Sequence, residues 1–405
     1  MHIKTKAATF WQLTFSVIIL STFFACQDPG TIGGGFVEKT DIDIDTLLVT
    51  SIATFNQNAY LGRLGRSATG TYQDDLFGDI NAVSFFKPSI FRSADTVVFD
   101  ENTSFTLRLQ LFENEVYGDT TQPGLYTIHR VNSLWRGSVF RNDMDISFDG
   151  AETIGQFSDV DADTNGVVEI ELSGTWKTDY ISFFNEADSI RDESYRLNEF
   201  GLAIVPDAGN NKITYTNYSV SNIRAIIPQD TTQDTTSHFI LDWGFDVDRT
   251  GEVNNADKVS LHSTYNTVLR LNLASLGDQV SEINFVRAEL VFNIDTLALK
   301  NTLAVNEIRT GALGLGLTIG PLDDEAYELG FGTIDLSAAA RTDGTYRFNI
   351  TNVLNDYIHG NLSINDLYIY LSANQGALAY TSLFNVNADP ENAPRVIIYG
   401  LESGK

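Results

Sequence analysis

Short runs of alternating or wholly apolar residues recur along this chain about every ten residues, with Gly, Asn and Asp turns between them. The first run, at residues 41–45, alternates strictly between Asp and Ile. Side chains in a strand point to opposite faces in turn, so such runs bury one face and expose the other. The pattern predicts an all-β protein built from sandwiches.

Two halves of the chain carry matching blocks in the same order, which predicts an internal repeat. In each half a strand leads into a short helix, at 168–181 and at 346–358. The other matched blocks are 105–112 with 288–292, 200–205 with 367–371, 215–218 with 380–383, and 223–227 with 394–398. We therefore expect two tandem jelly-roll-like β-sandwich domains. The order of elements resembles modules of carbohydrate-binding and cell-surface proteins, although fold does not imply function.

A polar stretch between the halves, residues 229–237, is too hydrophilic for a core and is the expected linker. It places the first sandwich at 41–228 and the second at 238–405. The length of the chain is consistent with two domains, because removal of an N-terminal segment of 25 residues from 405 leaves 380.

The N-terminal segment has the layout of a secretory signal. Lys4 and Lys6 precede an apolar stretch at 7–24, and Ala25 stands before the only cysteine, Cys26. This arrangement predicts a lipoprotein signal peptide at 1–25 and a lipid attached to Cys26. Phe23 departs from the leucine usual in such signals. The alternatives are an ordinary signal peptide with a chance cysteine, or a short N-terminal membrane helix.

A lipid on Cys26 would hold the protein to a membrane, because each buried methylene contributes about 0.8 kcal/mol. It would also leave no free thiol for a disulfide. Residues 26–40 are rich in glycine and predict a flexible tether. Gln27 after the cysteine favours sorting to the outer membrane, with either leaflet open.

Acidic residues dominate the charge, with a formal net charge of -27 that becomes about -29 once Lys4 and Lys6 are removed. A chain this acidic is not expected to bind nucleic acid through phosphates. Bare anionic lipid would repel it as well. The acids are spread along the chain, which favours a solvated surface, with divalent cation binding as the alternative.

A motif after the tether resembles the "leucine-glycine, tyrosine-x-aspartate, phenylalanine-glycine" signature of a domain-of-unknown-function family of Bacteroidetes outer-membrane lipoproteins. The resemblance implies a cell-envelope lipoprotein with no assigned activity, and it supplies no catalytic residues. The residues that carry it are Leu61-Gly62-Arg63, Gly70-Thr71-Tyr72-Gln73-Asp74-Asp75-Leu76-Phe77-Gly78 and Ala82.

One acidic stretch is similar to the front of a calcium loop. Asp161, Asp163 and Asn165 alternate before Gly166, so their oxygens could converge on an ion. Leu172 stands where a helical calcium hand would need a bidentate Glu. The alternative is a plain hairpin turn in which the glycine supplies a positive φ. We expect no cofactor other than this calcium ion.

Tryptophans offer a possible platform for sugar rings, because aromatic faces pack on apolar sugar faces. Trp135 and Trp243 are the candidates, and Trp135 is the one expected to be exposed. Trp176 occupies the repeat position of Leu354, which favours the core. Core packing is the alternative for all of them.

The remaining motifs indicate little chemistry. No histidine pair has zinc-ligand spacing and no G-x-S-x-G elbow is present, so an enzyme is not expected. Thr231 and Thr235 lie in Asp-Thr-Thr triplets similar to acceptors for O-linked glycosylation. A polar linker is the alternative explanation for those triplets.

Three functions therefore remain open. The first is a structural or protein-interaction lipoprotein of the outer membrane, with a partner in an envelope protein complex. The second is a surface lipoprotein that binds a polysaccharide through Trp135 or Trp243. A hydrolase is the weakest.

Overall fold

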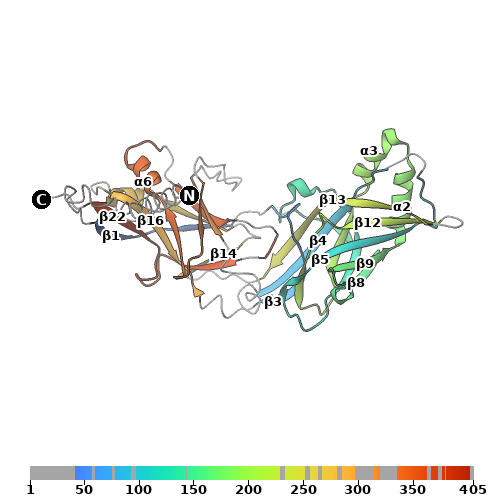
Figure 1. Ribbon diagram of the computed structural model, residues 1–405, viewed down its shortest axis with the longest axis horizontal. Helices are drawn as coiled ribbons and strands as arrows, with labels where there is room; N and C mark the ends of the chain where they lie inside the picture. Colours follow the sequence, from blue (N-terminus) through green and yellow to red (C-terminus); the bar gives the residue numbers. More distant parts are fainter. Residues whose placement is uncertain are drawn as a thin grey trace, which may run out of the picture.

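Antiparallel strands build most of the structure, which confirms the all-β, sandwich-like fold (Figure 1). The computed structural model describes residues 42–56, 60–74, 78–92, 97–142, 144–228, 233–250, 256–262, 267–280, 285–296, 314–319, 335–362, 366–372, 376–378 and 380–401. They form two lobes, which we call the first lobe (60–250) and the second lobe (42–56 with 256–401).

The strands of the first lobe pair into one continuous 11-stranded sheet with short helices at one side. One part of it has the order β9-β5-β12-β13, another part has the order β13-β4-β10-β6, and β11 and β3 connect β5 to β4. Its strands are β3 (Ser67–Asp74), β4 (Gly78–Pro88), β5 (Ser104–Gly118), β6 (Leu125–Val131), β7 (Phe148–Asp149), β8 (Gly155–Ser158), β9 (Val167–Leu172), β10 (Leu202–Pro206), β11 (Lys212–Thr216), β12 (Asn222–Pro228) and β13 (Gln233–Arg249). Its helices are α2 (Gly174–Asn185), α3 (Asp188–Asn198) and the 3-10 turns η1 (Gly137–Val139) and η2 (Asp159–Asp161).

The second lobe repeats this arrangement with fewer helices. Its two larger sheets have the orders β1-β22-β16-β19 and β2-β15-β20-β17-β18, and β14 and β21 form a third, two-stranded sheet. Its strands are β1 (Ile42–Leu48), β2 (Ala53–Asn56), β14 (Lys258–His262), β15 (Thr267–Asn272), β16 (Phe285–Asn293), β17 (Gly314–Ile319), β18 (Asp335–Ala339), β19 (Thr345–Asn349), β20 (Asp366–Ser372), β21 (Tyr380–Phe384) and β22 (Arg395–Leu401). Its described helices include α4 (Ala274–Val280) and α6 (Thr351–Ile358).

Strand pairing follows the same order in both lobes. In the first, β12 and β9 flank β5, and in the second, β22 and β19 flank β16. Likewise β10 lies between β4 and β6, while β20 lies between β15 and β17. Each lobe also has a helix directly after the corresponding strand, α2 after β9 and α6 after β19.

The start of the chain belongs to the second lobe, not to the first as the sequence suggested. β1 pairs with β22 over its whole length, from Ile42 opposite Leu401 to Leu48 opposite Arg395. β2 pairs with β15. Local alternation identifies a strand but not its partner, so the expected boundary at residue 41 is wrong. Ile44 is 61% exposed because β1 is an edge strand.

The expected linker at 229–237 is also wrong where the structure describes it. Residues 233–237 begin β13, which pairs with β12 through residue 239 and then with β4 from residue 240. One strand thus pairs in both parts of the first lobe's sheet, whereas in the second lobe β1 pairs in one sheet and β2 in another. The stretch is polar because Asp234, Thr235 and Ser237 are exposed at the sheet edge. Residues 229–232 lie outside the described part.

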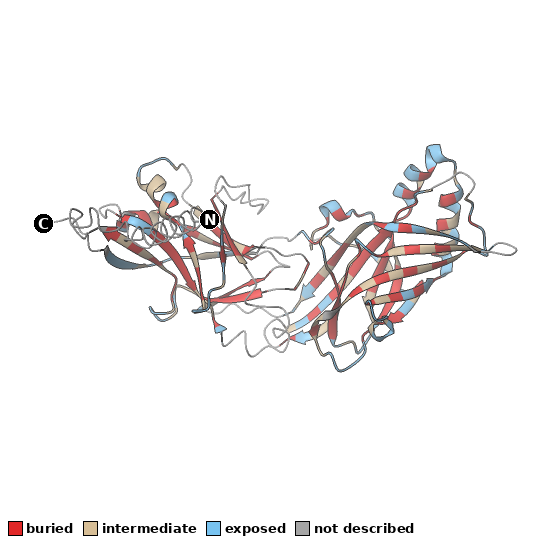
Figure 2. Cartoon of the chain, viewed as in Figure 1, coloured by how far each residue is buried: buried red, intermediate tan, exposed pale blue. Residues whose placement is uncertain are grey.

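Burial follows the alternation that the sequence shows (Figure 2). In β9, Val168, Ile170 and Leu172 are buried, whereas Glu169 and Glu171 are exposed. In β9 the buried face contributes to the main core of the first lobe, whereas β11 and β17 are buried on both faces.

A third cluster joins the lobes. Leu378 and Tyr380 of the second lobe pack with Ala68 and Tyr215 of the first. The Leu378 N–H donates to the Tyr215 hydroxyl at 3.0 Å. The junction is therefore an apolar contact with a hydrogen bond at its centre.

Candidate functional site

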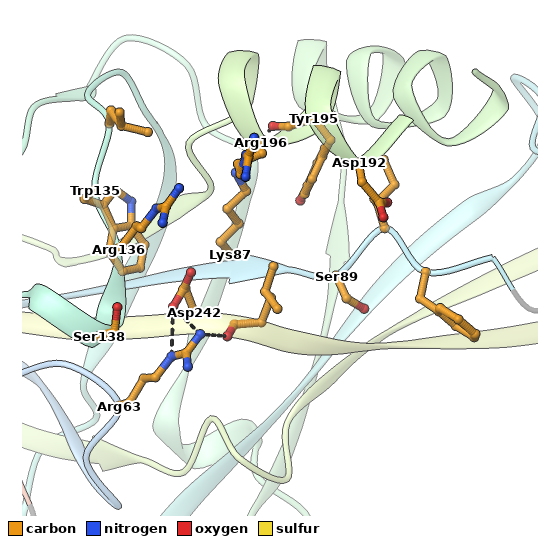
Figure 3. A pocket seen from close by; sticks show the side chains of 14 residues that line it. Arg63, Lys87, Ser89, Trp135, Arg136, Ser138, Asp192, Tyr195, Arg196 and Asp242 are labelled. Carbon is orange, nitrogen blue, oxygen red and sulfur yellow. Dashed lines mark hydrogen bonds and ion pairs between the residues drawn. The ribbon is translucent and has the colours of Figure 1, made fainter. Parts of the chain in front are cut away.

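A pocket of about 430 Å³ opens in the first lobe between α3, η1, the end of β4 and the middle of β13 (Figure 3). Its size falls within the range of small-molecule and peptide side-chain sites. It is lined by Arg63, Lys87, Ser89, Ile90, Phe91, Leu134, Trp135, Arg136, Ser138, Asp192, Tyr195, Arg196, Leu241 and Asp242.

The Leu61-Gly62-Arg63 motif forms one wall by passing between η1 and β13. The Leu61 N–H donates to the Phe140 carbonyl, and the Arg63 N–H donates to the Trp243 carbonyl. A Cβ on Gly62 would lie 1.8 Å from the Gly137 carbonyl oxygen, so only glycine permits this approach. The motif residues therefore have a packing role beside the pocket.

Arg63 is fixed at the pocket edge by several bonds. Its side chain donates to the Asp242 carboxylate at 2.9 Å and to the Leu241 carbonyl at 3.0 Å. Asp242 also accepts from the Gly137 N–H at 3.2 Å. Arg63 has φ +55, a left-handed conformation that costs a non-glycine residue of order 1 kcal/mol. Non-glycine residues in this region cluster at functional sites, so the observation agrees with a binding role.

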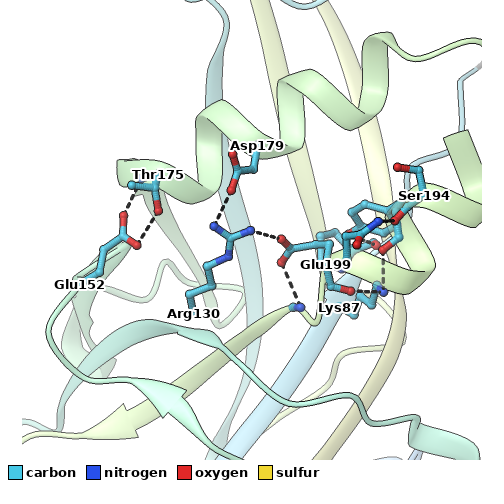
Figure 4. Close-up of polar contacts among 11 residues, drawn as sticks. Lys87, Arg130, Glu152, Thr175, Asp179, Ser194 and Glu199 are labelled. Carbon is cyan, nitrogen blue, oxygen red and sulfur yellow. Dashed lines mark hydrogen bonds and ion pairs between the residues drawn. The ribbon is translucent and has the colours of Figure 1, made fainter.

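The opposite wall, α3, is held by a charged network (Figure 4). Arg130 on β6 donates to Asp179 of α2 and to Glu199, which follows α3, each at 2.6 Å. Glu152 accepts from the Thr175 hydroxyl at 2.6 Å near the start of α2. Glu199 is fully buried, so this network sets the position of both helices.

Lys87 lies at the base of the pocket, near the end of β4. It is 7% exposed, and its ammonium group donates to the Tyr195 and Glu199 carbonyls. The ammonium nitrogen also lies 4.6 Å from the centre of the Tyr195 ring. The pKa of Lys87 is lowered to about 8, mainly by burial; Glu199 and Asp242 oppose this shift, and Arg136 and Arg196 add to it. A strongly shifted group in a cleft marks a candidate functional site.

Positive charge exceeds negative charge in this pocket, although the whole chain is acidic. Four cationic and two acidic side chains line it, and Asp242 is paired with Arg63. Within the described residues, Arg136 and Arg196 have no carboxylate within 4.0 Å. Two guanidinium groups are thus left to bind an anion.

Apolar side chains form the pocket rim. Phe91 is 67%, Leu134 62% and Leu241 41% exposed. Exposed groups of this kind mark interaction sites when they gather beside polar groups. The pocket therefore combines an apolar rim with a cationic base.

The structure places the two tryptophan candidates differently from expectation. Trp135 lines the pocket but is only 5% exposed, because it packs on Phe85 and Phe140. The prediction that Trp135 is exposed is wrong. Its indole N–H donates to the Phe200 carbonyl, and that of Trp243 donates to the Leu64 carbonyl. Trp243 is half-buried and does not line the pocket, so the two do not form one platform.

The suggested calcium loop is a turn between η2 and β9. Asp161 accepts from the Ser158 N–H at 3.0 Å, and Asp163 accepts from the N–H groups of Asn165 and Val167. Gly166 has φ +75. These backbone bonds lower the pKa of Asp163. Within the described ranges, no three His, Cys, Asp or Glu side chains are grouped to hold a metal ion. A calcium site at Asp161, Asp163 and Asn165 stays a prediction.

The modification sites remain predictions as well. Cys26 and Thr231 lie outside the described residues. Thr235 is exposed on β13, where a hydroxyl is accessible.

Sequence reasoning missed the cationic pocket. Lys87 follows an apolar strand run and Arg136 and Arg196 lie far apart in the chain, so no local spacing joins them. The motif containing Arg63 was the one available signal.

Comparison with known proteins adds no relative. No protein-family model matches the chain, and no curated protein matches it. Among the described helices, none has both the length and the apolar character needed to cross a membrane.

Proposed function

We propose that this protein is a non-enzymatic, lipid-anchored protein of the outer membrane that binds a partner protein in an envelope complex. The observation that carries the proposal is the pocket of the first lobe with its exposed apolar rim of Phe91, Leu134 and Leu241. Interfaces are commonly organised around apolar anchors that fill such pockets.

The position of the tether supports this arrangement. The predicted lipid at Cys26 connects through residues 27–41 to β1, which belongs to the second lobe. The second lobe would then lie next to the membrane, and the first lobe would present its pocket to partners. The motif that resembles Bacteroidetes envelope lipoproteins agrees with that location.

We also infer that the two lobes are copies of one module. The equal order of strand pairing supports the duplication. The first lobe differs by its two packed helices, α2 and α3, and the pocket lies against α3. Duplication followed by divergence would give one anchoring lobe and one binding lobe.

Crosslinking in intact cells tests the proposal. The lipidated chain, its Leu134→Asp variant and a Val220→Asp control are recovered and their crosslinked partners identified by mass spectrometry. Val220 is also exposed, at 59%, but lies outside the pocket. One partner lost only in Leu134→Asp supports the proposal. Equal recovery from all three chains contradicts it.

The anchor has a separate test. Cys26→Ser should move the protein from the membrane fraction to the soluble fraction, because it removes the acylated thiol. Retention of this variant in membranes would contradict lipidation at Cys26.

Polysaccharide binding is the second candidate. Its supporting observation is that Trp135 lies in the pocket wall beside uncommitted guanidinium groups, which suit an acidic sugar. Binding of the unmodified protein and of the Leu134→Asp variant to a polysaccharide array is compared. Binding to a polysaccharide that the variant loses would support this second candidate over protein binding.

A further inference from the structure

The cations at the base of the pocket limit which chemical groups of a partner can bind there. Arg136 and Arg196 are both exposed. Arg136 directly precedes η1 and Arg196 lies on α3. The positive charge of each lowers the pKa of Lys87. Three cations of unlike origin thus face one cavity (Figure 3). Gathering like charges is unfavourable unless an anion joins them. An arginine fork suits the two oxygens of a carboxylate.

A neutral ligand fits this pocket less well. Asp242 is bound through Oδ1 by Arg63 and by the Gly137 N–H, so its charge is already balanced by Arg63. With Asp242 paired to Arg63, three cations and the one carboxylate of Asp192 remain in the lining, so the net charge of the pocket is positive and favours an anion.

The rim indicates what accompanies the anion. Phe91, Leu134 and Leu241 are all exposed, and Phe91 is the one exposed aromatic side chain in the lining, because Trp135 and Tyr195 are buried. A single phenyl ring beside two leucines suits an apolar side chain of a peptide, since apolar anchors form the core of protein interfaces. Peptide recognition of this kind combines apolar pockets with charged contacts.

We propose that the pocket binds an acidic segment of a partner protein, with a Glu or Asp carboxylate on Arg136, Arg196 and Lys87 and a neighbouring apolar side chain on the rim. This proposal rests on the proposed function, because it names the chemistry of the partner. The carboxylate is held by charge-assisted hydrogen bonds at the base of the pocket, and the rim excludes water from them.

The experiment measures binding of small probes to residues 26–405 carrying Cys26→Ser, by ligand-observed NMR titration. The probes are acetyl-Phe-Glu-amide, its neutral analogue acetyl-Phe-Gln-amide, acetyl-Gly-Glu-amide, glucuronate and inorganic phosphate. We expect acetyl-Phe-Glu-amide to bind at least about tenfold more tightly than each of the other four, since only it has both the charge and the apolar side chain.

Two double variants locate the site. Arg136→Gln/Arg196→Gln should weaken binding of acetyl-Phe-Glu-amide at least about tenfold. Lys177→Gln/Arg341→Gln removes the same charge outside the pocket and should leave it unchanged. A circular dichroism melt of each variant checks that the fold is kept.

Several results would overturn the proposal. If acetyl-Phe-Gln-amide binds as tightly as acetyl-Phe-Glu-amide, the pocket does not recognise the carboxylate. If glucuronate or phosphate binds as tightly as acetyl-Phe-Glu-amide, the pocket is a site for acidic sugars or phosphates. Absence of probe binding, or loss of binding in the control double variant, also contradicts it. The crosslinking result with Leu134→Asp is independent of these, so protein binding can stand while carboxylate recognition fails.

Discussion

Arg130 and Glu199 form an ion pair of 2.6 Å in which the carboxylate is fully buried. The second guanidinium nitrogen of Arg130 binds Asp179, so one side chain connects β6 to the middle of α2 and to the C-terminal end of α3. Burial raises the pKa of Glu199, and Arg130 opposes that rise by stabilising the charged form. The pocket wall thus depends on a single arginine.

Arg130→Met should lower the free energy of unfolding by about 3–5 kcal/mol, because it leaves a buried carboxylate without its partner. Urea unfolding monitored by fluorescence measures this. Adding Glu199→Gln to Arg130→Met should recover part of the loss, since the remaining side chain is neutral.

The matched control is Arg108→Met, which breaks a 2.9 Å pair with Glu169 on the protein surface. Exposed pairs contribute about 0–1 kcal/mol. A loss in Arg108→Met as large as that in Arg130→Met would show that burial is not the cause.

Gly62→Ala should lower the free energy of unfolding by about 2–3 kcal/mol, because overpacking forces the backbone near η1 to move. The new Cβ would meet the Gly137 carbonyl oxygen at 1.8 Å. Gly150→Ala is the control, since its Cβ has no atom within 4 Å. Urea unfolding of both variants tests the comparison, and equal stability would exclude the tight packing at Gly62.

Alternation and repeat order were enough to predict the strands, and the position of Trp176 in the repeat correctly indicated the core, where it is fully buried. The pairing partner of each strand was not predictable from the sequence. Ile44, for example, would alternate with aspartates in the same way whether β1 paired with β22 or with a strand of the other lobe. Trp135 follows Leu134 in a loop, where no periodicity tells which of the two side chains is buried. Lys87 and Arg196 meet only through the fold.

The strand pairing makes a prediction about fragments. A fragment of residues 60–250 contains every described strand of the first lobe and should unfold cooperatively on heating. A fragment of residues 41–228 lacks β13 and with it Ile240, Phe245 and Val247, which are buried against the sheets. It should show no cooperative transition by circular dichroism. A sharp transition in 41–228 would contradict the assignment of β13 to the first lobe.

His238 should make the protein sensitive to acid. It is buried with Phe99, Tyr180 and Phe184 around its ring, and burial lowers its pKa to about 4. Between the unfolded value of 6.5 and this value, the unfolded chain binds more protons than the folded one. Stability should therefore fall as pH decreases through this window, by about 3 kcal/mol in full.

Urea unfolding at several pH values from 7 to 4 measures this loss, and His238→Leu is the comparison. Asp246 titrates in the same range with the opposite sign, because burial raises its pKa to about 6. The difference between wild type and His238→Leu removes the contribution of Asp246. A difference that does not change with pH would contradict the role of His238.

Lys87 should make carboxylate binding depend on pH. The pKa of this ammonium is lowered to about 8, mainly by burial; Glu199 and Asp242 oppose this shift, and Arg136 and Arg196 add to it. As pH rises through 8, Lys87 loses its proton while the arginines keep theirs. Affinity for acetyl-Phe-Glu-amide should thus be highest below pH 7 and fall several-fold by pH 9, because one of the cations at the pocket base is lost.

Lys87→Met separates this effect from a general response to pH. The variant should bind the probe more weakly at pH 7, and its affinity should no longer change between pH 7 and pH 9. The Lys177→Gln/Arg341→Gln chain should keep the wild-type pH profile, because neither residue lines the pocket. A wild-type profile that stays flat across pH 8 would show that the Lys87 ammonium does not contact the carboxylate, whereas a slope that persists in Lys87→Met would assign the titration to another group.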